Sequence, residues 1–265
     1  MEKNILLIGA NSELAQNTIK ELKNKNYTIY STSRNAGIME KSVHEFHLDV
    51  TCEEDFIHLK ERFKNLTFDT IINFTGIAIS APVSELNENE LKKQFDVNLY
   101  GLLKIIKYFA PNLSPKGKLV NVSSMASYGI FPFLSPYCMS KASADILLNA
   151  YATENNVKVV SIRPGAVATK FWETSIELNK NTFENIQSFE KEKKFLVENA
   201  NKNSLHATNP IYVSKKIAQI VDLKNPKAVY NIGLDAKFAK LTRFLPQDFV
   251  NSIVKLALKT RVNKK

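Results

Sequence analysis

Near its start the chain reads Asn4-Ile5-Leu6-Leu7-Ile8-Gly9-Ala10-Asn11-Ser12-Glu13-Leu14-Ala15. The aliphatic run that ends at Ile8 is typical of a strand buried on both faces, and Gly9 predicts a tight turn into a helix that begins near Glu13. Backbone N–H groups at such a helix start can face a diphosphate. A nucleotide-binding loop prefers three glycines and only Gly9 is present, so this stretch alone fits a plain strand-to-helix turn equally well.

The same alternation of a short apolar run and a longer helical stretch continues along the chain. It predicts strands at Asn4–Ile8, Thr28–Thr32, Glu45–Leu48, Thr70–Phe74, Lys118–Val122, Lys158–Ile162 and Val229–Ile232. It predicts connecting helices near Glu13–Lys25, Glu53–Lys64, Glu88–Ala110, Pro136–Glu154 and Tyr212–Val221. This order is the signature of an α/β fold, a doubly wound parallel sheet with helices on both faces. A length of 265 residues fits one such domain over residues 1–265.

Composition narrows the classes of function. Hydrophobic residues make up 44% of the chain and charged residues 23%, which is typical of a globular protein. Two cysteines, Cys52 and Cys138, cannot form a disulfide framework and suit a reducing, cytoplasmic compartment. No apolar stretch approaches the ~20 residues of a membrane span. The net charge of +10 is scattered, which favours a solvated surface over a nucleic-acid site, and the four histidines lack metal-ligand spacing, so we expect no metal.

Two segments depart from the alternation. Residues 169–208 form a long insertion with many aromatic and aliphatic side chains at the carboxyl end of a predicted strand, where open α/β sheets bind ligands. We expect a substrate lid or an extra packed pair of helices, and the two are compatible. Residues 235–265 mix apolar and basic residues and predict an amphipathic helical extension. Such an extension packs against the domain or a partner subunit, or makes peripheral contact with a membrane.

A tyrosine and a lysine carry the sharper chemical signal. Tyr137 and Lys141 lie four residues apart in a predicted helix, which places them on the same face one turn apart. A neighbouring ammonium stabilises a phenolate, so we expect Lys141 to lower the pKa of Tyr137 from its ordinary value of ~10. Ser124 follows a predicted strand, which puts its hydroxyl at the carboxyl edge of the sheet. A Tyr-x-x-x-Lys pattern by itself is common, so its meaning depends on the residues around it.

Those residues form an ordered set: Gly9-x-x-Ser12, Asp49-Val50, Asn73-Phe74-Thr75-Gly76, Val97-Asn98, Asn121-Val122-Ser123-Ser124, Tyr137-x-x-x-Lys141 and Arg163-Pro164-Gly165-x-Val167-x-Thr169. Over about residues 3–235 the set resembles the short-chain dehydrogenase/reductase family, whose members are single-domain Rossmann-fold enzymes using NAD or NADP. The resemblance implies a catalytic group of Asn98, Ser124, Tyr137 and Lys141. In the family the serine binds the substrate oxygen and the tyrosine exchanges its proton. The lysine holds the nicotinamide ribose and lowers the tyrosine pKa, and the asparagine braces a water relay.

The resemblance also implies which residues contact the cofactor. They are Gly9, Asn11, Ser12 and Leu14 in the first loop, Arg34 after the second strand, Asp49 and Val50 at the adenine, Asn73 and Gly76 in the central cleft, Tyr137 and Lys141, and Pro164, Val167 and Thr169 at the nicotinamide. Arg34 stands where NAD-preferring relatives carry an acidic residue, and a guanidinium can pair with a 2′-phosphate, which favours NADP over NAD. Glu13 replaces the second glycine of the family's loop, so its carboxylate would either repel a diphosphate or point to solvent.

These observations predict an oxidoreductase that reduces a carbonyl, or oxidises an alcohol, with NADP. The aromatic insertion suggests a small lipophilic substrate, and residues 230–237 and 243–246 resemble the branch that acts on hydroxysteroids and retinol. Helices at 88–110 and 136–154 commonly form subunit faces in the family, so we expect a homo-oligomer. The alternative is a regulatory protein that binds a dinucleotide without turnover, which Glu13 and the glycine-poor loop would favour.

Overall fold

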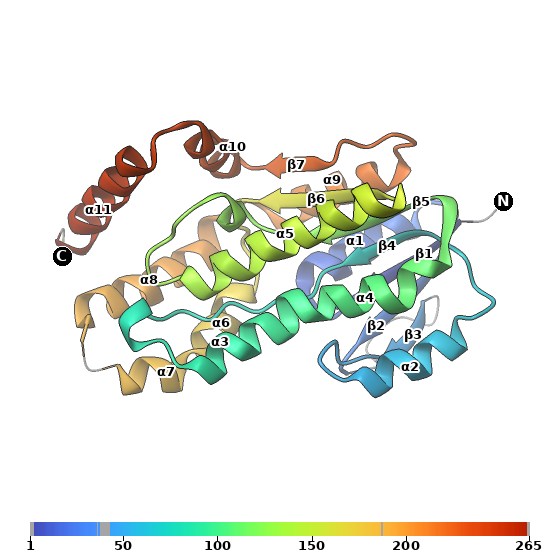
Figure 1. The fold of residues 1–265 in the computed structure, drawn as a ribbon, viewed down its shortest axis with the longest axis horizontal. Helices are drawn as coiled ribbons and strands as arrows, with labels where there is room; N and C mark the ends of the chain where they lie inside the picture. Colours follow the sequence, from blue (N-terminus) through green and yellow to red (C-terminus); the bar gives the residue numbers. More distant parts are fainter. Residues whose placement is uncertain (1–2, 36, 38–42, 187, 264–265) are drawn as a thin grey trace.

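The computed structural model describes residues 3–35, 37, 43–186 and 188–263 (Figure 1). Gln187 of the predicted lid, and Lys264 and Lys265 of the predicted extension, lie outside the described residues. The described strands are β1 (Lys3–Ile8), β2 (Tyr27–Ser33), β3 (His44–His47), β4 (Phe68–Asn73), β5 (Leu113–Val122), β6 (Lys158–Pro164) and β7 (Val229–Ile232). They form one parallel sheet in the order β3-β2-β1-β4-β5-β6-β7, which confirms the predicted α/β class.

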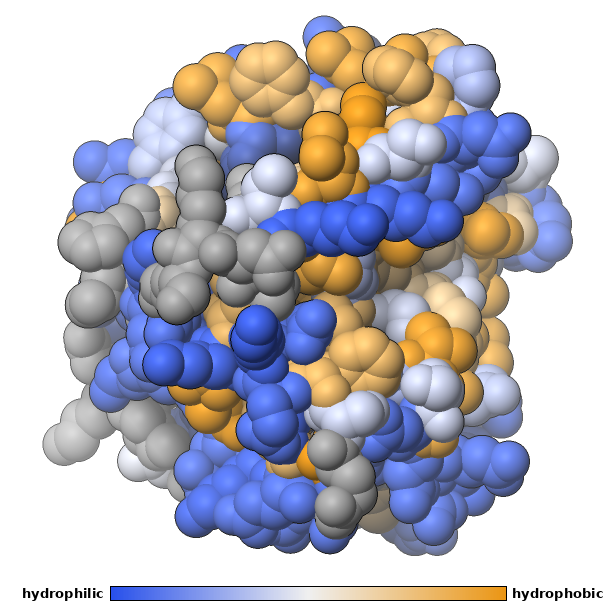
Figure 2. All heavy atoms as spheres, turned by 90° about the vertical axis from the view of Figure 1, so that its left-hand side faces the viewer, coloured by the Kyte–Doolittle hydropathy of each residue, from blue (hydrophilic) through white to orange (hydrophobic). Residues whose placement is uncertain are grey.

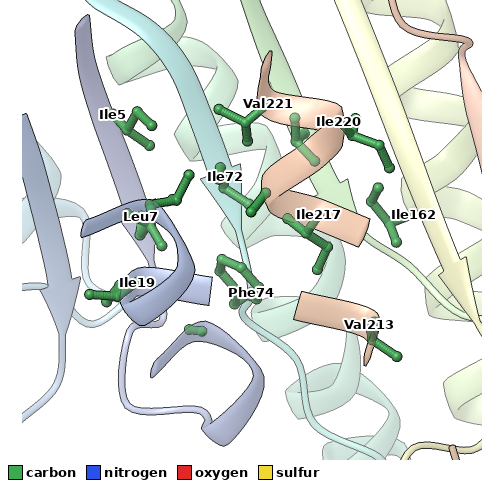
Figure 3. Packing of buried hydrophobic residues seen from close by; sticks show 14 of the residues in the cluster. Ile5, Leu7, Ile19, Ile72, Phe74, Ile162, Val213, Ile217, Ile220 and Val221 are labelled. Carbon is green, nitrogen blue, oxygen red and sulfur yellow. The ribbon is translucent and has the colours of Figure 1, made fainter. Parts of the chain in front are cut away.

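Helices cover both faces of this sheet. On one face, α1 (Glu13–Lys23) and α9 (Pro210–Asp222) bury Ile19 and Ile217 against the strand residues Ile5, Leu7 and Ile72 (Figure 3). The other face is covered by α2 (Glu53–Arg62), α4 (Gly101–Phe109) and α5 (Ser135–Asn155), whose side chains pack with those of β1, β4 and β5. Burial on both faces is the reason that the strand sequences are nearly continuous in apolar residues.

The predicted continuous helix at 88–110 is wrong in one respect. The structure has α3 (Glu88–Phe95), then a π-helical turn, η2 (Asp96–Tyr100), and then α4. Within the turn, Asn98 accepts a hydrogen bond from the N–H of Ile77 (2.9 Å) and donates one to the carbonyl of Ile77 (3.0 Å). A single wide turn of this kind is often found at functional sites. Here it coincides with the anchoring of the Asn98 side chain on the segment that follows β4.

The two unusual segments are helical. Residues 169–208 contain α6 (Phe171–Leu178), α7 (Lys180–Asn185) and α8 (Glu190–His206), which lie beyond the carboxyl edge of the sheet, at the left of Figure 1. After β7 come α10 (Leu234–Leu241), the short 3₁₀ turn η5 (Thr242–Phe244) and α11 (Gln247–Asn263), and α11 contacts α8. Among the helices of the described residues, none combines the length and the apolar character that crossing a bilayer requires.

Candidate active site

The predicted site residues lie at or near the carboxyl edge of the sheet. Because every strand runs in the same direction, the segments after β1, β2, β4, β5 and β6 all begin at this edge. Gly9 follows β1, Arg34 follows β2, and Ser124 lies two residues beyond β5. The order of the strands reverses between β1 and β4, and open α/β sheets bind ligands in the crevice at such a switch point.

The loop after β1 is shaped for a close approach to a ligand. Gly9 has φ of +81°, and a Cβ on it would lie 2.9 Å from Cγ2 of Thr75, so a side chain is excluded there. The N–H groups of Gly9 and Ala10 both donate to the carbonyl of Thr32 (3.0 Å each). Ser12 caps α1 by accepting a hydrogen bond from the N–H of Ala15 (3.2 Å). The first N–H groups of a helix lack intrahelical partners, and those of α1 begin at the crevice.

Buried polar atoms without partners mark the same region. Oδ1 of Asn11, Oγ1 of Thr32 and Oγ of Ser33 are buried and make no hydrogen bond among the described residues. Leaving such an atom unsatisfied costs about 1–3 kcal/mol. A ligand that carries hydroxyl and phosphate groups would satisfy them. The glycine turn, the start of α1 and these three atoms therefore fit a dinucleotide.

Arg34, directly after β2, and Asp49, two residues after β3, lie close to each other at this edge. The Arg34 side chain is exposed, and its carbonyl oxygen lies 3.0 Å from Nδ1 of His47. Burial raises the pKa of Asp49, but hydrogen bonds from Thr51 and the charges of Arg34 and His47 bring it below its ordinary value. Val50, predicted at the adenine, packs its side chain against Gly101, where a Cβ would lie only 3.1 Å away.

The proposed tyrosine and lysine are both buried side chains of α5. Tyr137 is 8% exposed and Lys141 is 5% exposed, and Nζ of Lys141 lies 5.8 Å from the centroid of the Tyr137 ring. Nζ of Lys141 donates to the carbonyl of Val122 (3.1 Å). Gly76 leaves room for this amine, because a Cβ there would lie 3.0 Å from Nζ of Lys141 and 3.5 Å from Oδ1 of Asn98. The π-helical turn, α5 and the segment after β4 thus meet at one point.

Burial dominates the protonation of this pair. It raises the pKa of Tyr137 to about 12, against the effect of a hydrogen bond with Ser124. It lowers the pKa of Lys141 to about 8, against the charge of Asp145. The expectation of a lowered pKa for Tyr137 is therefore wrong, because desolvation by burial outweighs the lowering effect of the hydrogen bond with Ser124. At neutral pH the tyrosine is protonated and most of the lysine is charged.

Ser124 and Asn98 are held by short contacts of their own. Ser124 caps the 3₁₀ turn η4 (Met125–Tyr128), and its Oγ accepts a hydrogen bond from the N–H of Ala126 (3.1 Å). Nδ2 of Asn98 donates to Oγ of Ser140 (3.0 Å), which in turn donates to the carbonyl of Tyr137 (2.9 Å). This chain of hydrogen bonds fixes the turn that carries Asn98 against the helix that carries the tyrosine.

The segment after β6 closes the other end of the crevice. The N–H of Gly165 donates to the carbonyl of Ile232 (2.9 Å), and the N–H of Ala166 donates to Oδ2 of Asp235 (2.7 Å). Pro164, Val167 and Thr169 lie on this braced segment, just before α6. Oε2 of Glu13, at the start of α1, lies 3.4 Å from the N–H of Lys170, which precedes α6.

Several polar residues that the motifs did not indicate support the site. They are Gln94, which accepts from the N–H of Ile79 (2.7 Å); Asn179, which accepts from the N–H of Ser80 (2.8 Å); and Asp145, which pairs with Arg163 (2.9 Å). Gln94 lies one helical turn before Asn98, and Asp145 lies one turn after Lys141. Helical spacing from a motif residue was therefore the signal that could have found these two.

An apolar wall faces the tyrosine on the lid side. The ring of Phe171, in α6, lies 6.0 Å from that of Tyr137, and Leu134 and Phe131 pack with them. A small cavity of about 40 Å³ lies among α6, α7 and α8 behind this wall. Its apolar lining includes Leu134, Trp172, Ile176, Phe183 and Leu196, and its polar lining consists of Ser80, Ser175, Asn179, Asn199 and Asn203.

Comparisons with known proteins agree with this geometry. Residues 3–180 match the short chain dehydrogenase family, adh_short. The probable short-chain type dehydrogenase/reductase VdlC of Helicobacter pylori is 30% identical over 274 residues, covering 96% of this chain and 97% of that protein. The 3-ketodihydrosphingosine reductase of Bacteroides thetaiotaomicron is 25% identical over 266 residues, covering 95% and 96%.

A solved structure shares the fold over nearly the whole chain. It is a short chain dehydrogenase from Burkholderia cenocepacia J2315 in complex with NADP, with a TM-score of 0.70 and 18% identity, and the match covers 95% of this chain and 97% of that one. The family match spans more than half of the chain, and the relative from Helicobacter pylori matches it nearly from end to end. The chain therefore belongs to the short-chain dehydrogenase/reductase family of oxidoreductases.

Proposed function

We propose that this protein is an NADPH-dependent reductase of a lipophilic carbonyl compound, or catalyses the reverse oxidation of the alcohol. It acts as a single domain over residues 1–265, with residues 169–208 as the substrate lid, in the cytoplasm. The observation that carries the proposal is the buried pair of Tyr137 and Lys141, which lies beside Ser124 and under the aromatic wall of the lid. General acid–base chemistry needs a positioned proton donor of this kind.

Each member of the group has a separate task. NADPH, when bound, supplies a hydride to the carbonyl carbon. Ser124 donates a hydrogen bond to the carbonyl oxygen, and Tyr137 gives that oxygen its proton as negative charge develops there. A pKa of about 12 keeps the tyrosine protonated before the reaction, and the charged Lys141 stabilises the phenolate that remains. Asn98 holds the π-helical turn in place through Ile77 and Ser140.

The cofactor is NADP. Residues 32–34 read Thr-Ser-Arg, so the end of β2 lacks the carboxylate that would bind a 2′-hydroxyl and offers the exposed guanidinium of Arg34 instead. The Burkholderia cenocepacia structure with the same fold contains NADP. The residues that hold the cofactor are Gly9, Asn11, Ser12, Leu14, Arg34, Asp49, Val50, Asn73, Gly76, Tyr137, Lys141, Pro164, Val167 and Thr169.

The substrate is lipophilic because the wall that it meets is apolar. Phe171 and Leu134 cover the tyrosine, and Trp172, Ile176 and Phe183 line the cavity behind them. The relative from Bacteroides thetaiotaomicron is named for the reduction of 3-ketodihydrosphingosine. The cavity of about 40 Å³ is far smaller than ligand pockets of roughly 300–1,000 Å³. We therefore infer that α6, α7 and α8, which line this cavity, shift to admit a larger substrate.

A second candidate is a regulatory protein that binds the dinucleotide and does not turn it over. The Glu13 carboxylate favours it, because it stands at the start of α1, where a diphosphate would bind. The intact group around Tyr137 favours the enzyme over the regulator.

We also propose that the protein forms a homo-oligomer. The helices α4 and α5 expose Leu103 and Ile146, which are 43% and 70% exposed.

A cofactor titration followed by one substitution tests the proposal. We expect the fluorescence of NADPH to change on binding at concentrations where NADH binds weakly, and reduction of lipophilic ketones to consume NADPH. Tyr137→Phe should keep NADPH binding and lose most turnover, because only the transferable proton is removed. Tyr151→Phe on the same helix is the matched control and should keep full activity. Full activity of Tyr137→Phe contradicts the acid role, and NADPH binding without turnover of any ketone favours the regulator.

A further inference from the structure

The C-terminal helices expose an unusual number of large apolar side chains. We define the C-terminal apolar surface as Leu234, Phe238, Leu241, Phe244, Leu245, Phe249, Ile253 and Leu256, whose exposed fractions run from 42% to 77%. Leu234, Phe238 and Leu241 are spaced by four and three residues in α10, and Phe249, Ile253 and Leu256 repeat that spacing in α11. Each helix therefore presents an apolar stripe on its outward face. The outward face of a surface helix that contacts only water is normally polar.

Apolar side chains gather on this part of the molecular surface. Figure 2 shows orange side chains gathered along the upper part of the face, at the height where Figure 1 places α10 and α11. An exposed apolar patch of this kind on a folded protein marks a contact with another molecule or with a membrane. The opposite side of the same helices is used in packing, since Ala236 of α10 and Val250 of α11 are buried.

The charges beside the patch decide what covers it. Between residues 234 and 260 the exposed cations are Lys237, Lys240, Arg243, Lys255 and Lys259, and the exposed anion is Asp248. The other carboxylate of the segment, Asp235, is turned inward onto the N–H of Ala166. A second copy of the chain would bring the same cations face to face across a two-fold axis, which is repulsive. Anionic lipid headgroups complement them, while the acyl chains receive the apolar stripes.

We propose that the C-terminal apolar surface docks the protein on an anionic lipid membrane, without spanning it. The surface adjoins both sides of the candidate site. The α11 helix contacts the lid helix α8, and α10 contacts η4, the turn that Ser124 caps. A lipophilic molecule leaving the bilayer would therefore meet the lid first. The docking itself does not depend on the proposed catalytic function.

Sedimentation with vesicles tests the docking. We expect the full-length protein to sediment with vesicles of phosphatidylcholine and phosphatidylglycerol and much less with pure phosphatidylcholine. The double variant Phe244→Ser, Phe249→Ser should bind at least about tenfold more weakly, because binding follows the apolar area inserted. Lys255→Glu with Lys259→Glu should weaken binding to the anionic vesicles by more than about fivefold, the typical effect of one cation. Ile57→Ser, on the exposed face of α2, is the matched control and should bind as wild type does.

Three outcomes would overturn the docking. The first is equal sedimentation of wild type with both kinds of vesicle, and the second is wild-type binding by both double variants. The third is that wild type does not bind vesicles and that light scattering shows it as an oligomer which the Phe244→Ser, Phe249→Ser variant no longer forms. Circular dichroism, measured on the same samples, shows that each variant is folded, and NADPH fluorescence is measured alongside it. Absence of NADPH binding in wild type alongside normal vesicle binding would sink the proposed function and leave the docking intact.

Discussion

Replacing Lys141 by methionine should make the protein more stable at neutral pH while removing its activity. The buried amine has a pKa of about 8 in the folded chain and 10.5 as its ordinary value, a difference of about 2.5 units. At about 1.4 kcal/mol per unit, keeping this amine charged costs about 3 kcal/mol of stability at pH 7. The variant also loses the hydrogen bond to the carbonyl of Val122, worth about 1 kcal/mol. We therefore expect a net gain of about 2 kcal/mol.

The sign of the pH dependence separates this cause from better packing. Below pH 8 the lysine is protonated in both the folded and the unfolded chain, so the cost is fully present. Between pH 8 and 10.5 the unfolded chain binds more protons than the folded one, so the stability of wild type rises with pH. Tyr137 has the opposite effect above pH 10, because its folded pKa is raised to about 12. The advantage of the variant should thus shrink above pH 8 and be gone near pH 10.

Urea unfolding followed by circular dichroism at several values between pH 7 and pH 10 measures this difference. Lys93→Met, at an exposed position of α3, is the control and should change the free energy of unfolding by no more than about 0.5 kcal/mol at any of these values. A Lys141→Met variant that is less stable than wild type at pH 7 would refute the reasoning. A gain in stability that stays constant up to pH 10 would refute it equally, because it would not come from the buried charge.

Three further substitutions test other parts of the site. Arg34→Asp should raise the dissociation constant of NADPH by about 10–100-fold and that of NADH much less, because a charge-assisted hydrogen bond to phosphate is lost; equal changes would rule out the phosphate contact. Gly76→Ala should lower kcat/KM by about tenfold or more, since its methyl group would lie 3.0 Å from Nζ of Lys141 and displace that amine. Gly129→Ala meets an ordinary contact at 3.6 Å and should be neutral. Asp145→Asn should cost about 3–5 kcal/mol in urea unfolding because Arg163 is left as an unpaired buried charge, and Arg163→Met in the same chain should restore part of it. A loss below about 1 kcal/mol would contradict this last effect.

The strand positions could be predicted from the sequence because a strand that is buried on both faces consists of nearly consecutive apolar residues. The predicted strand at 229–232 has the ends of β7, and the helix at 13–25 ends only two residues later than α1. The start of β5 at Leu113 was missed, because Pro115 and Gly117 interrupt its apolar pattern. The break in the helix at 88–110 was missed for another reason. It depends on the hydrogen bonds between Asn98 and Ile77, which lie far apart in the sequence.

The candidate site shows the same limit. Spacing along one helix correctly placed Tyr137 beside Lys141, because helical geometry is local. The pKa of the tyrosine depends on how deeply the surrounding elements bury it, and that depth is a property of the whole fold. The role of Asn179 was invisible for the same reason, since its partner Ser80 belongs to a segment 99 residues away.

The ribosome synthesises the chain from its N-terminus, so Asp235 appears after most of the sheet. The segment after β6, which Asp235 holds, therefore depends on a residue that is made late. The N–H of Ala166 is held by the Asp235 carboxylate, and Gly165 lacks a side chain where a Cβ would lie 1.8 Å from that carboxylate. While the ribosome still holds β7, the strands from β1 to β6 can pair and build most of the crevice. The segment after β6 is then still unfastened. A nascent chain would therefore form the loop after β1 first and fix the segment after β6 last, once Asp235 has emerged and folded back.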